Sequence, residues 1–380
     1  MCIRDSYNTF QPLLYQVATG ALNPGDVTYA LRTFAGRRPH VRFQRAAVTE
    51  VDPQNRRVRL DSGVEVAYDY LILACGVTAN YFGIPGAAEH ARTTYTRAGA
   101  IEVRDRVLGN LEAFAQGRVD AVEPVAVVVG GGPTGVEMAG ALAELRNAGL
   151  PLAYPEVDPQ RVRVVLVEMT DKVLGPFDPK LREYAADALR KRGVELRLGV
   201  AVKEVHDDCV VLADGERLPS AATIWATGVK VDDGVRGWNL PQGRGGRIRV
   251  GPDLRVEGHP EIFAVGDVAA DTDEPLPQLA RPAIDGGRHA GAQVRRLLAG
   301  RSTEPFVYRD RGISATIGRS DAVIQLPKGV KVRGFPAWLG WVGVHVIMLM
   351  GGRNRLATLL NLAVRYLTWR RAPNVIVGDP

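Results

Sequence analysis

The sequence contains only three cysteines, Cys2, Cys75 and Cys209, among its 380 residues. No two of them have the C-x-x-C spacing, which disfavours a disulfide scaffold, a zinc site and a dithiol redox centre. We therefore predict that the protein has no metal site and works in a reducing compartment.

Long apolar runs are also missing, since no stretch reaches the roughly 18 residues that a membrane-spanning helix needs. The net charge is +6, but the basic residues are scattered and form no RNA- or DNA-binding motif, so no nucleic-acid partner is expected. Internal repeats and low-complexity tracts are absent from the sequence. The 46% of apolar residues are enough for two domains with separate cores.

Short apolar runs alternate with helical patterns in the middle of the chain. Residues 125–129 (VAVVV) are typical of a buried parallel strand, and this alternation predicts a doubly wound parallel sheet. The other strands are expected at 64–74, 162–167, 194–198, 221–226 and 262–265, and the helices at 98–116, 136–145, 180–191 and 278–298.

The motif GGGPTG (130–135) follows strand 125–129 directly and opens a helix. Its glycines Gly130, Gly132 and Gly135 fit the G-x-G-x-x-G fingerprint in the context that makes it specific. Gly130 permits the tight turn, Gly132 lets a pyrophosphate approach the backbone, and Gly135 lets helix and strand pack closely. The alternative is an ordinary strand-to-helix turn, but the context favours a dinucleotide site.

Two acidic residues accompany this motif. Glu168 ends the next strand, where a carboxylate can bind the ribose hydroxyls and repel a 2′-phosphate, which favours NAD over NADP. The long spacing indicates an insertion at 150–161, and a solvated strand-end charge is the alternative for Glu168. Glu137 lies in the expected first helical turn, where the helix dipole alone would favour it. The functional alternative is that Glu137 faces a flavin.

A second constellation is EIFAVGDV (261–268), followed by the helix expected at 278–298. Gly266 allows close approach of a ligand to the backbone, and Asp267 lies where open α/β sheets bind ligands. Its carboxylate could accept a bond from a polyol such as the ribityl chain of FAD. A Gly-Asp turn that only caps structure is the alternative.

Three motifs in this order resemble the pyridine nucleotide–disulfide reductase superfamily: GGGPTGVE (130–137), ATGV (226–229) and AVGDV (264–268). Within it, four further stretches are similar to type II NADH dehydrogenases, the non-proton-pumping NADH:quinone oxidoreductases. They are FQPLLYQVATG (10–20), YDYLILACGVTANYFGIPG (68–86), ATIGRSDAV (315–323) and residues 334–371.

This resemblance implies non-covalently bound FAD, NADH as electron donor, menaquinone or ubiquinone as acceptor, and a homodimer on the cytoplasmic face of the cell membrane. Carried over by position, Val48 contacts the FAD adenosine through its backbone, and Gly76, Asp267 and Ala280 line the flavin. Glu137 matches the family glutamate beside flavin and nicotinamide, and becomes the expected catalytic residue.

The helix near the expected quinone site departs from the family pattern. Arg281 and Asp285 stand where much of the family has glutamines, and their i, i+4 spacing allows them to pair with each other. The identity of the quinone is therefore left open.

The C-terminal region is expected to bind the membrane surface. Residues 337–350 are apolar with the single titratable group His345, and residues 356–369 have apolar side chains at helical spacing, flanked by arginines. Such helices lie in the interface of an anionic membrane. The alternative is a helix pair packed on the protein's own core or on a dimer partner.

We therefore expect an α/β fold with two Rossmann-like dinucleotide-binding domains and an amphipathic helical membrane anchor. The FAD domain (1–120 and 236–327) is interrupted by an inserted NAD(H) domain (121–235), and the anchor follows at 328–380. The first six residues (MCIRDS) are expected to lie outside the fold. Because no glycine fingerprint precedes residue 125, we expect the natural reading frame to begin a β-α-β unit earlier, about 35 to 40 residues. Without that unit, FAD binding is expected to be poor.

Two rival functions stay open at this point. A sulfide:quinone reductase shares these features but needs reactive cysteines near the flavin, and no partner is placed to help Cys75. A catalytically quiet NAD(H)-sensing flavoprotein would show no NADH-driven turnover.

Overall fold

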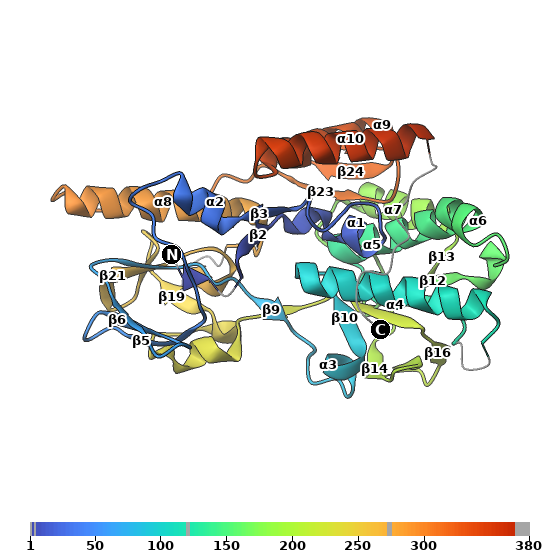
Figure 1. Ribbon diagram of the computed structural model, residues 1–380, viewed down its shortest axis with the longest axis horizontal. Helices are drawn as coiled ribbons and strands as arrows, with labels where there is room; N and C mark the ends of the chain where they lie inside the picture. Colours follow the sequence, from blue (N-terminus) through green and yellow to red (C-terminus); the bar gives the residue numbers. More distant parts are fainter. Residues whose placement is uncertain (1, 4, 119–121, 272–275, 369–380) are drawn as a thin grey trace. The chain divides into compact units, whose positions relative to one another are not determined.

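The computed structural model describes residues 2–3, 5–118, 122–271 and 276–368, and the chain divides into two compact units. Unit 1 comprises Met1–Tyr7, Ala30–Asn80 and Val229–Asp310, and unit 2 comprises Asn8–Tyr29, Tyr81–Gly228 and Arg311–Pro380. Both units are therefore built from segments that are far apart in the sequence (Figure 1).

Unit 2 is built on a five-stranded parallel sheet in the order β10-β17-β11-β12-β13. Its central strand β11 (Val125–Val129) is buried at every residue, as expected for a parallel strand covered on both faces. The predicted strands of this unit are confirmed with small shifts in their ends. The other strands are β10 (Ala91–Thr93), β12 (Arg163–Glu168), β13 (Val194–Leu198) and β17 (Ala222–Trp225).

The helices of unit 2 agree with the predicted patterns except at one junction. Helix α5 (Pro133–Glu144) continues through a π-helical turn, Leu145–Gly149, into α6 (Leu150–Ala153). The expected insertion at 150–161 is therefore helical at its start, because Leu145 and Leu150 are both buried. The remaining helices here are α1 (Leu14–Ala18), α3 (Ala87–His90), α4 (Arg97–Ala115) and α7 (Pro179–Lys191).

Two antiparallel three-stranded sheets complete unit 2. One consists of β14 (Val202–Val205), β15 (Cys209–Leu212) and β16 (Arg217–Pro219). The other consists of β23 (Ile313–Thr316), β24 (Ala322–Gln325) and β25 (Lys331–Arg333), and leads into α9 (Phe335–Met348) and α10 (Gly352–Thr368). Short elements are β2 (Tyr7–Thr9) paired with β3 (Thr28–Ala30), and the 3-10 turns Gln11–Leu13, Pro159–Arg161 and Pro327–Gly329.

The C-terminal helices α9 and α10 pack on the core of unit 2. Trp341 (2% exposed) and Leu362 belong to the same apolar cluster as the parallel sheet and α5. Two side-chain amides tie α10 to the segment around β3: Asn354 donates to the Thr28 carbonyl at 2.6 Å, and Asn361 donates to Asp26 at 2.6 Å. The inner sides of both helices therefore pack on the protein's own core, which was the alternative to membrane binding.

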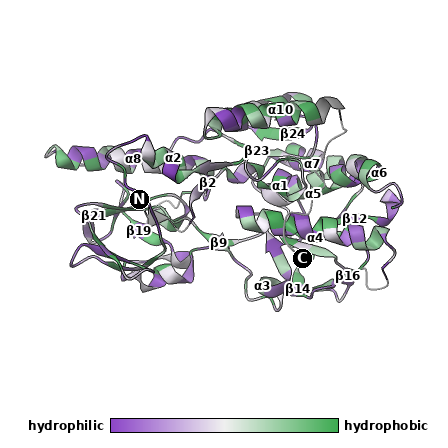
Figure 2. Ribbon diagram, viewed as in Figure 1, coloured by the Kyte–Doolittle hydropathy of each residue, from purple (hydrophilic) through white to green (hydrophobic). Residues whose placement is uncertain are grey.

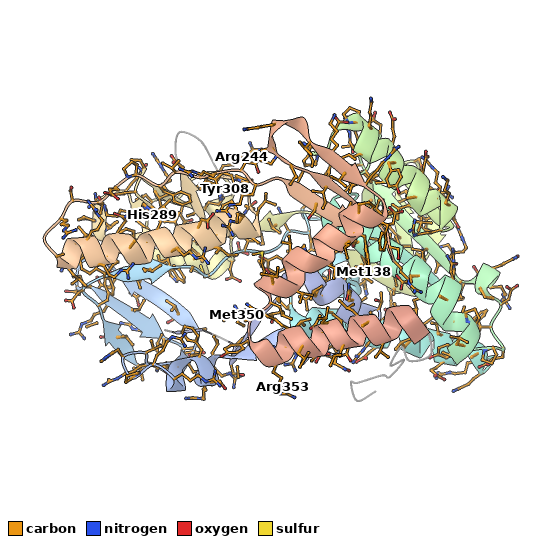
Figure 3. All side chains as sticks on the ribbon, turned by 90° about the horizontal axis from the view of Figure 1, so that it is seen from above. Met138, Arg244, His289, Tyr308, Met350 and Arg353 are labelled. Carbon is orange, nitrogen blue, oxygen red and sulfur yellow. The ribbon has the colours of Figure 1, made fainter. Side chains whose placement is uncertain are left out.

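The outer side of the same helices is apolar and exposed. Figure 2 shows apolar stretches on α10, and Figure 3 shows both helices from above, with Met350 and Arg353 at the turn that joins them. The exposed side chains include Phe335, Leu339, Val344, Ile347, Leu356, Leu359, Leu360 and Val364. Across the described residues, no helix combines the length and apolarity needed to cross a membrane.

Unit 1 contains a mixed five-stranded sheet in the order β22-β19-β20-β21-β8. Strand β21 runs parallel to β8, and β19 parallel to β22, with β20 antiparallel between them. The bounds are β8 (Leu71–Leu73), β19 (Ile248–Val250), β20 (Arg255–Val256), β21 (His259–Ala264) and β22 (Ala269–Asp271), and the long helix is α8 (Ala280–Leu298).

A second sheet of unit 1 corrects the strand expected at 64–74. This stretch forms two strands in different sheets, β7 (Glu65–Ala67) and β8. Strand β7 pairs with β6 (Arg57–Leu60), which pairs with β5 (Val48–Asp52). The second half is also not fully buried, since Ile72 is 41% exposed.

The smaller elements of unit 1 include the start of the chain. Cys2–Ile3 (β1) pairs in parallel with Gln44–Arg45 (β4), and Leu31 donates its N–H to the Ser6 carbonyl. The first six residues therefore do not all lie outside the fold, contrary to expectation. The others are α2 (Leu31–Gly36), β9 (Thr78–Ala79) paired with β18 (Val229–Lys230), and the 3-10 turns Asp233–Trp238, Arg244–Gly246 and Gly266–Val268.

The bounds of the two units differ from the predicted domain limits. The inserted segment of unit 2 is Tyr81–Gly228, whereas 121–235 was expected. The difference at its start arises because β10 pairs in parallel with β17 and thereby joins the central sheet. Strands β23 and β24 also belong to unit 2, although the predicted FAD domain extended to 327.

Candidate functional site

The glycine turn after β11 leaves the backbone at the start of α5 accessible to a ligand. Gly130 has φ +111°, which side chains rarely adopt, and Gly132 is the N-cap of α5 with no side chain capping the helix. A Cβ on Gly132 would meet no atom within 4 Å. The uncapped N–H groups at this helix start can therefore receive a phosphate.

The third glycine has a different role, because it is a packing contact. A Cβ on Gly135 would lie 1.8 Å from the Gly130 carbonyl oxygen and 3.6 Å from Cβ of Ala226. No side chain fits there without moving the backbone. This is the close helix–strand packing expected for the last glycine of the motif.

Glu168 lies against the glycine turn. One carboxylate oxygen accepts the Gly131 N–H at 2.6 Å, and the other accepts the N–H and hydroxyl of Thr170 at 2.8 and 2.9 Å. The structure therefore brings Glu168 to the N–H of Gly131, 37 positions away in the sequence. Its carboxylate still has acceptor sites for ribose hydroxyls.

Glu137 is enclosed by parts of unit 2 that are distant in sequence. It is the fifth residue of α5, so it lies beyond the first helical turn in which it was expected, and the helix-dipole explanation loses its basis. The Thr316 backbone N–H donates to its Oε1 at 3.3 Å, and the Trp341 side chain also donates to the carboxylate. Burial raises the pKa of Glu137 to about 8, although these two hydrogen bonds lower it.

Sequence reasoning identified Glu137 but not the residues that surround it. Thr316 and Trp341 follow it by 179 and 204 positions, and neither carries a motif of its own. The Thr316 hydroxyl also donates to the Tyr15 hydroxyl at 3.1 Å. The Tyr15 hydroxyl accepts a second hydrogen bond from the Gln16 amide at 2.9 Å. Only the packing of α1, β23 and α9 around α5 brings these groups together.

The residues expected to line a flavin lie in unit 1. Gly266 (φ +70°) follows β21, and Gly76 (φ +68°) follows β8 in the same sheet, where a Cβ added to Gly76 would meet no atom within 4 Å. Burial raises the pKa of Asp267, and the Arg247 guanidinium acts in the opposite direction. Ala280 is the first residue of α8, and Val48 the first of β5.

Arg281 and Asp285 pair with each other as expected. The guanidinium and carboxylate approach to 3.0 Å at i, i+4 spacing on α8, and both side chains are about a quarter exposed. Arg288 is a second, more distant partner of Asp285 at 3.8 Å.

Cys75 differs from its expected place at a buried strand end. It lies two residues beyond β8, and its side chain is accessible. The surrounding protein atoms nevertheless raise the pKa of its thiol to about 11, with a smaller contribution from Asp232. The thiol is therefore protonated at neutral pH and a weak nucleophile.

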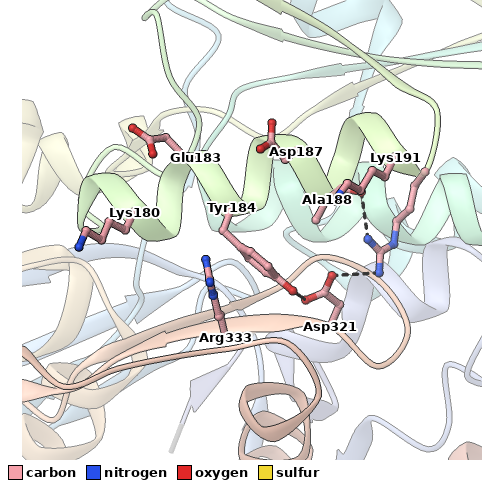
Figure 4. A pocket seen from close by; sticks show the side chains of 9 residues that line it. Lys180, Glu183, Tyr184, Asp187, Ala188, Lys191, Asp321 and Arg333 are labelled. Carbon is pink, nitrogen blue, oxygen red and sulfur yellow. Dashed lines mark hydrogen bonds and ion pairs between the residues drawn. The ribbon is translucent and has the colours of Figure 1, made fainter.

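A separate cavity of about 310 Å³ lies between α7 and the hairpin β24–β25 (Figure 4). Tyr184 and Arg192 both contact Asp321 there, at 2.8 and 3.2 Å. None of the predicted site residues lines this cavity, so it is not part of the candidate site.

Comparison with known proteins places these features in one family. The family model described as pyridine nucleotide-disulphide oxidoreductase matches residues 3–287. The type II NADH:quinone oxidoreductase Ndh of Mycobacterium tuberculosis is 36% identical over 99% of this chain and 84% of its own length. The chain belongs to the type II NADH:quinone oxidoreductases, within the pyridine nucleotide-disulphide oxidoreductase family.

Other relatives extend the comparison. A mitochondrial internal alternative NAD(P)H-ubiquinone oxidoreductase of Arabidopsis thaliana is 31% identical over 96% of this chain and 78% of its own. The solved structure of NDH2 from Plasmodium falciparum in complex with NADH has a TM-score of 0.90, covering 98% of this chain and 94% of that one at 18% identity. A sulfide:quinone oxidoreductase from Aquifex aeolicus has a TM-score of 0.74, at 18% identity, 97% of this chain and 89% of that one. Both structures show that the fold is shared.

The two glycines of the turn should respond differently to substitution by alanine. Gly135→Ala should lower the free energy of unfolding by roughly 1–3 kcal/mol or more, because its methyl group meets backbone. Gly132→Ala should leave the melting temperature unchanged but weaken NADH binding, because its methyl group projects into open space. Calorimetry and NADH titration measure both effects. A stable Gly135→Ala variant would contradict the packing role.

Substitution of Glu168 tests the cofactor preference. Glu168→Arg should lower the ratio of kcat/KM for NADH over NADPH by about tenfold or more, since a charged hydrogen bond contributes ~1.5–3 kcal/mol. Glu168→Gln is the matched control, since it keeps a carbonyl acceptor for Gly131 but cannot attract a 2′-phosphate. If the ratio is the same in Glu168→Arg and in the unaltered protein, Glu168 is not the ribose ligand.

Proposed function

We propose that this protein is a non-electrogenic NADH:quinone oxidoreductase that uses FAD to transfer electrons from NADH to a membrane quinone. The observation that carries the proposal is the 36% identity over 99% of the chain to an enzyme of that name, in a chain that has the built glycine turn and Glu168. The Gly266–Asp267 strand end adds the expected flavin side.

The residues present in unit 1 fit a flavin. Gly76 and Gly266 both have positive φ, and no atom lies near Gly76 where a side chain would stand. The Nε of Arg247 is buried without a hydrogen-bond partner, beside the partly desolvated Asp267. A polar ligand with hydroxyl and carbonyl groups would satisfy both. FAD, when bound, supplies the two-electron acceptor chemistry that links NADH to quinone.

The chain's own residues bind NADH and would hold FAD. The turn Gly130–Gly132 and the start of α5 bind the NADH pyrophosphate, and Glu168 binds the adenosine ribose. For FAD, Asp267 would accept a hydrogen bond from the polyol chain, and Ala280, the first residue of α8, would line the flavin, where the helix dipole would favour negative charge. Val48 would contact the adenosine through its backbone.

Glu137 supplies acid–base chemistry. Reduction of a quinone consumes two protons, and the pKa of Glu137 is raised to about 8 by burial. The carboxyl is therefore mainly protonated at pH 7 and can give up the proton on Oε to a site that gains negative charge. Glu137 is the catalytic residue of this proposal. The acceptor is menaquinone or ubiquinone, near the Arg281–Asp285 pair of α8.

The protein works at the cytoplasmic face of the cell membrane as a homodimer, and α9 and α10 hold it to the lipid surface. Their outer sides are exposed and apolar, and Arg353 and Arg355 lie at the start of α10. Apolar burial together with cationic side chains is the basis of interfacial binding.

An anaerobic half-reaction experiment tests the function. NADH should bleach the flavin absorbance of the FAD-loaded protein, and a menaquinone or ubiquinone analogue should restore it within a turnover. Sulfide, used as the control donor, should bleach nothing, because the Cys75 thiol has its pKa raised to about 11. Binding of NADH without bleaching would instead favour an NAD(H) sensor.

Membrane attachment is tested with two equally exposed apolar residues. Ile347 on α9 and Leu298 at the end of α8 are each 70% exposed. Ile347→Asp should weaken flotation with anionic liposomes by about tenfold or more, because burial of such a side chain contributes ~1.5–3 kcal/mol. Leu298→Asp should float like the unaltered protein. Equal flotation of both variants would show that Ile347 of α9 does not contact the membrane.

A further inference from the structure

The carboxyl group of Glu137 is held by donors from two elements outside its own helix. The Thr316 backbone N–H at the end of β23 reaches Oε1 at 3.3 Å, and Trp341 of α9 donates through its indole. Only proline would remove the backbone donor, and it would also constrain the backbone at the end of β23. Trp341 is therefore the donor whose contribution can be separated cleanly.

Trp341 is fixed tightly enough to aim its N–H. It is 2% exposed, its ring stacks on His345 with centroids 3.8 Å apart, and it meets Tyr15 edge to face at 6.2 Å. The Trp341 carbonyl is 2.7 Å from Nδ1 of His345, which ties the two residues one turn apart on α9. A buried ring in contact with two aromatic side chains loses little further freedom when it donates to a carboxylate.

The charges around Glu137 are few. Near Glu137, α1 presents Tyr15, β23 presents no titratable group, and α9 presents His345. The other elements packed on α5, namely β11, β12, β13 and α7, contribute no charge to the pKa of Glu137. Burial lowers the pKa of His345, so this ring is neutral at pH 7. No described cation neutralises Glu137, so the ionised carboxylate is stabilised by its hydrogen bonds from Thr316 and Trp341.

We propose that Trp341 is a positioning residue for Glu137, and that α9 thereby forms a wall of the active site as well as the candidate membrane face. The outer side of α9 exposes Leu339, Val344 and Ile347, whereas its inner side carries Trp341. One helix thus connects the surface that would meet lipid to the carboxyl that handles the proton. This inference rests on the proposed role of Glu137.

Infrared titration of the protonated carboxyl band measures Glu137 directly and needs no turnover. The band is assigned by its loss in Glu137→Gln. In the unaltered protein its midpoint is expected near the pKa of about 8. In Trp341→Phe the midpoint should rise by about one pH unit, because the anion loses a donor while burial persists. The pH at which quinone turnover falls should rise with it, with KM for NADH unchanged.

The control is the same substitution one turn earlier on the same helix. Trp338→Phe removes an indole that stacks on Phe335, at 5.6 Å between centroids, and should leave the Glu137 midpoint unchanged. If Trp341→Phe fails to fold, β-(3-benzothienyl)alanine at position 341 keeps the ring shape and lacks only the N–H. An unchanged midpoint in a folded protein with either replacement at 341 would overturn the proposal.

The same data separate this proposal from the role of Glu137. If the midpoint shifts while Glu137→Gln retains full quinone turnover, Trp341 still positions the carboxyl, and the catalytic assignment of Glu137 fails. If Glu137→Gln is inactive and the midpoint does not shift, the proposed function stands and the positioning role of Trp341 is wrong.

Discussion

Helix α5 is confined between two backbones, and the candidate site depends on this constraint. At its start a Cβ on Gly135 would lie 1.8 Å from the Gly130 carbonyl oxygen. Five residues further along, a Cβ on Gly140 would lie 2.7 Å from the backbone of Ile317, just after β23. Glycines at both contacts let the helix lie directly on the parallel sheet and on the C-terminal sheet. Glu137 stands between these two contacts, so its place is set by backbone packing rather than by its own side chain.

This enclosure explains the unusual acid. Two hydrogen bonds favour the carboxylate of Glu137, yet loss of water is the larger effect and the pKa rises to about 8. Glu168, in contrast, is partly exposed and receives N–H groups from Gly131 and Thr170. Two glutamates of one unit thus have different environments: Glu137 is buried with a raised pKa, whereas the carboxylate of Glu168 is partly exposed and accepts backbone N–H groups.

The C-terminal helices combine the two readings that their sequence left open. Their inner sides complete the core of unit 2 through Trp341 and Leu362, and their outer sides leave several large apolar side chains exposed. Exposed apolar patches of this kind mark surfaces that bind a partner or lipid. Because α9 also contributes a wall to the Glu137 site, removal of the C-terminal region would open the core and is not a clean test of membrane binding.

The parallel sheet, the glycine turn and the acid beside it can be predicted from the amino-acid sequence alone, because valine-rich runs and G-x-G-x-x-G specify local backbone states. Even the Arg281–Asp285 pair follows from i, i+4 spacing. The surroundings of each group depend instead on how distant segments pack. The burial of Glu137 comes from elements about 180 and 200 positions away in the chain. The accessibility of Cys75 arises because the strand before it is short. The limits of the units depend on the pairing of β10 with β17. Such contacts between distant segments leave no periodicity or spacing to recognise, since they depend only on which surfaces meet when the chain folds.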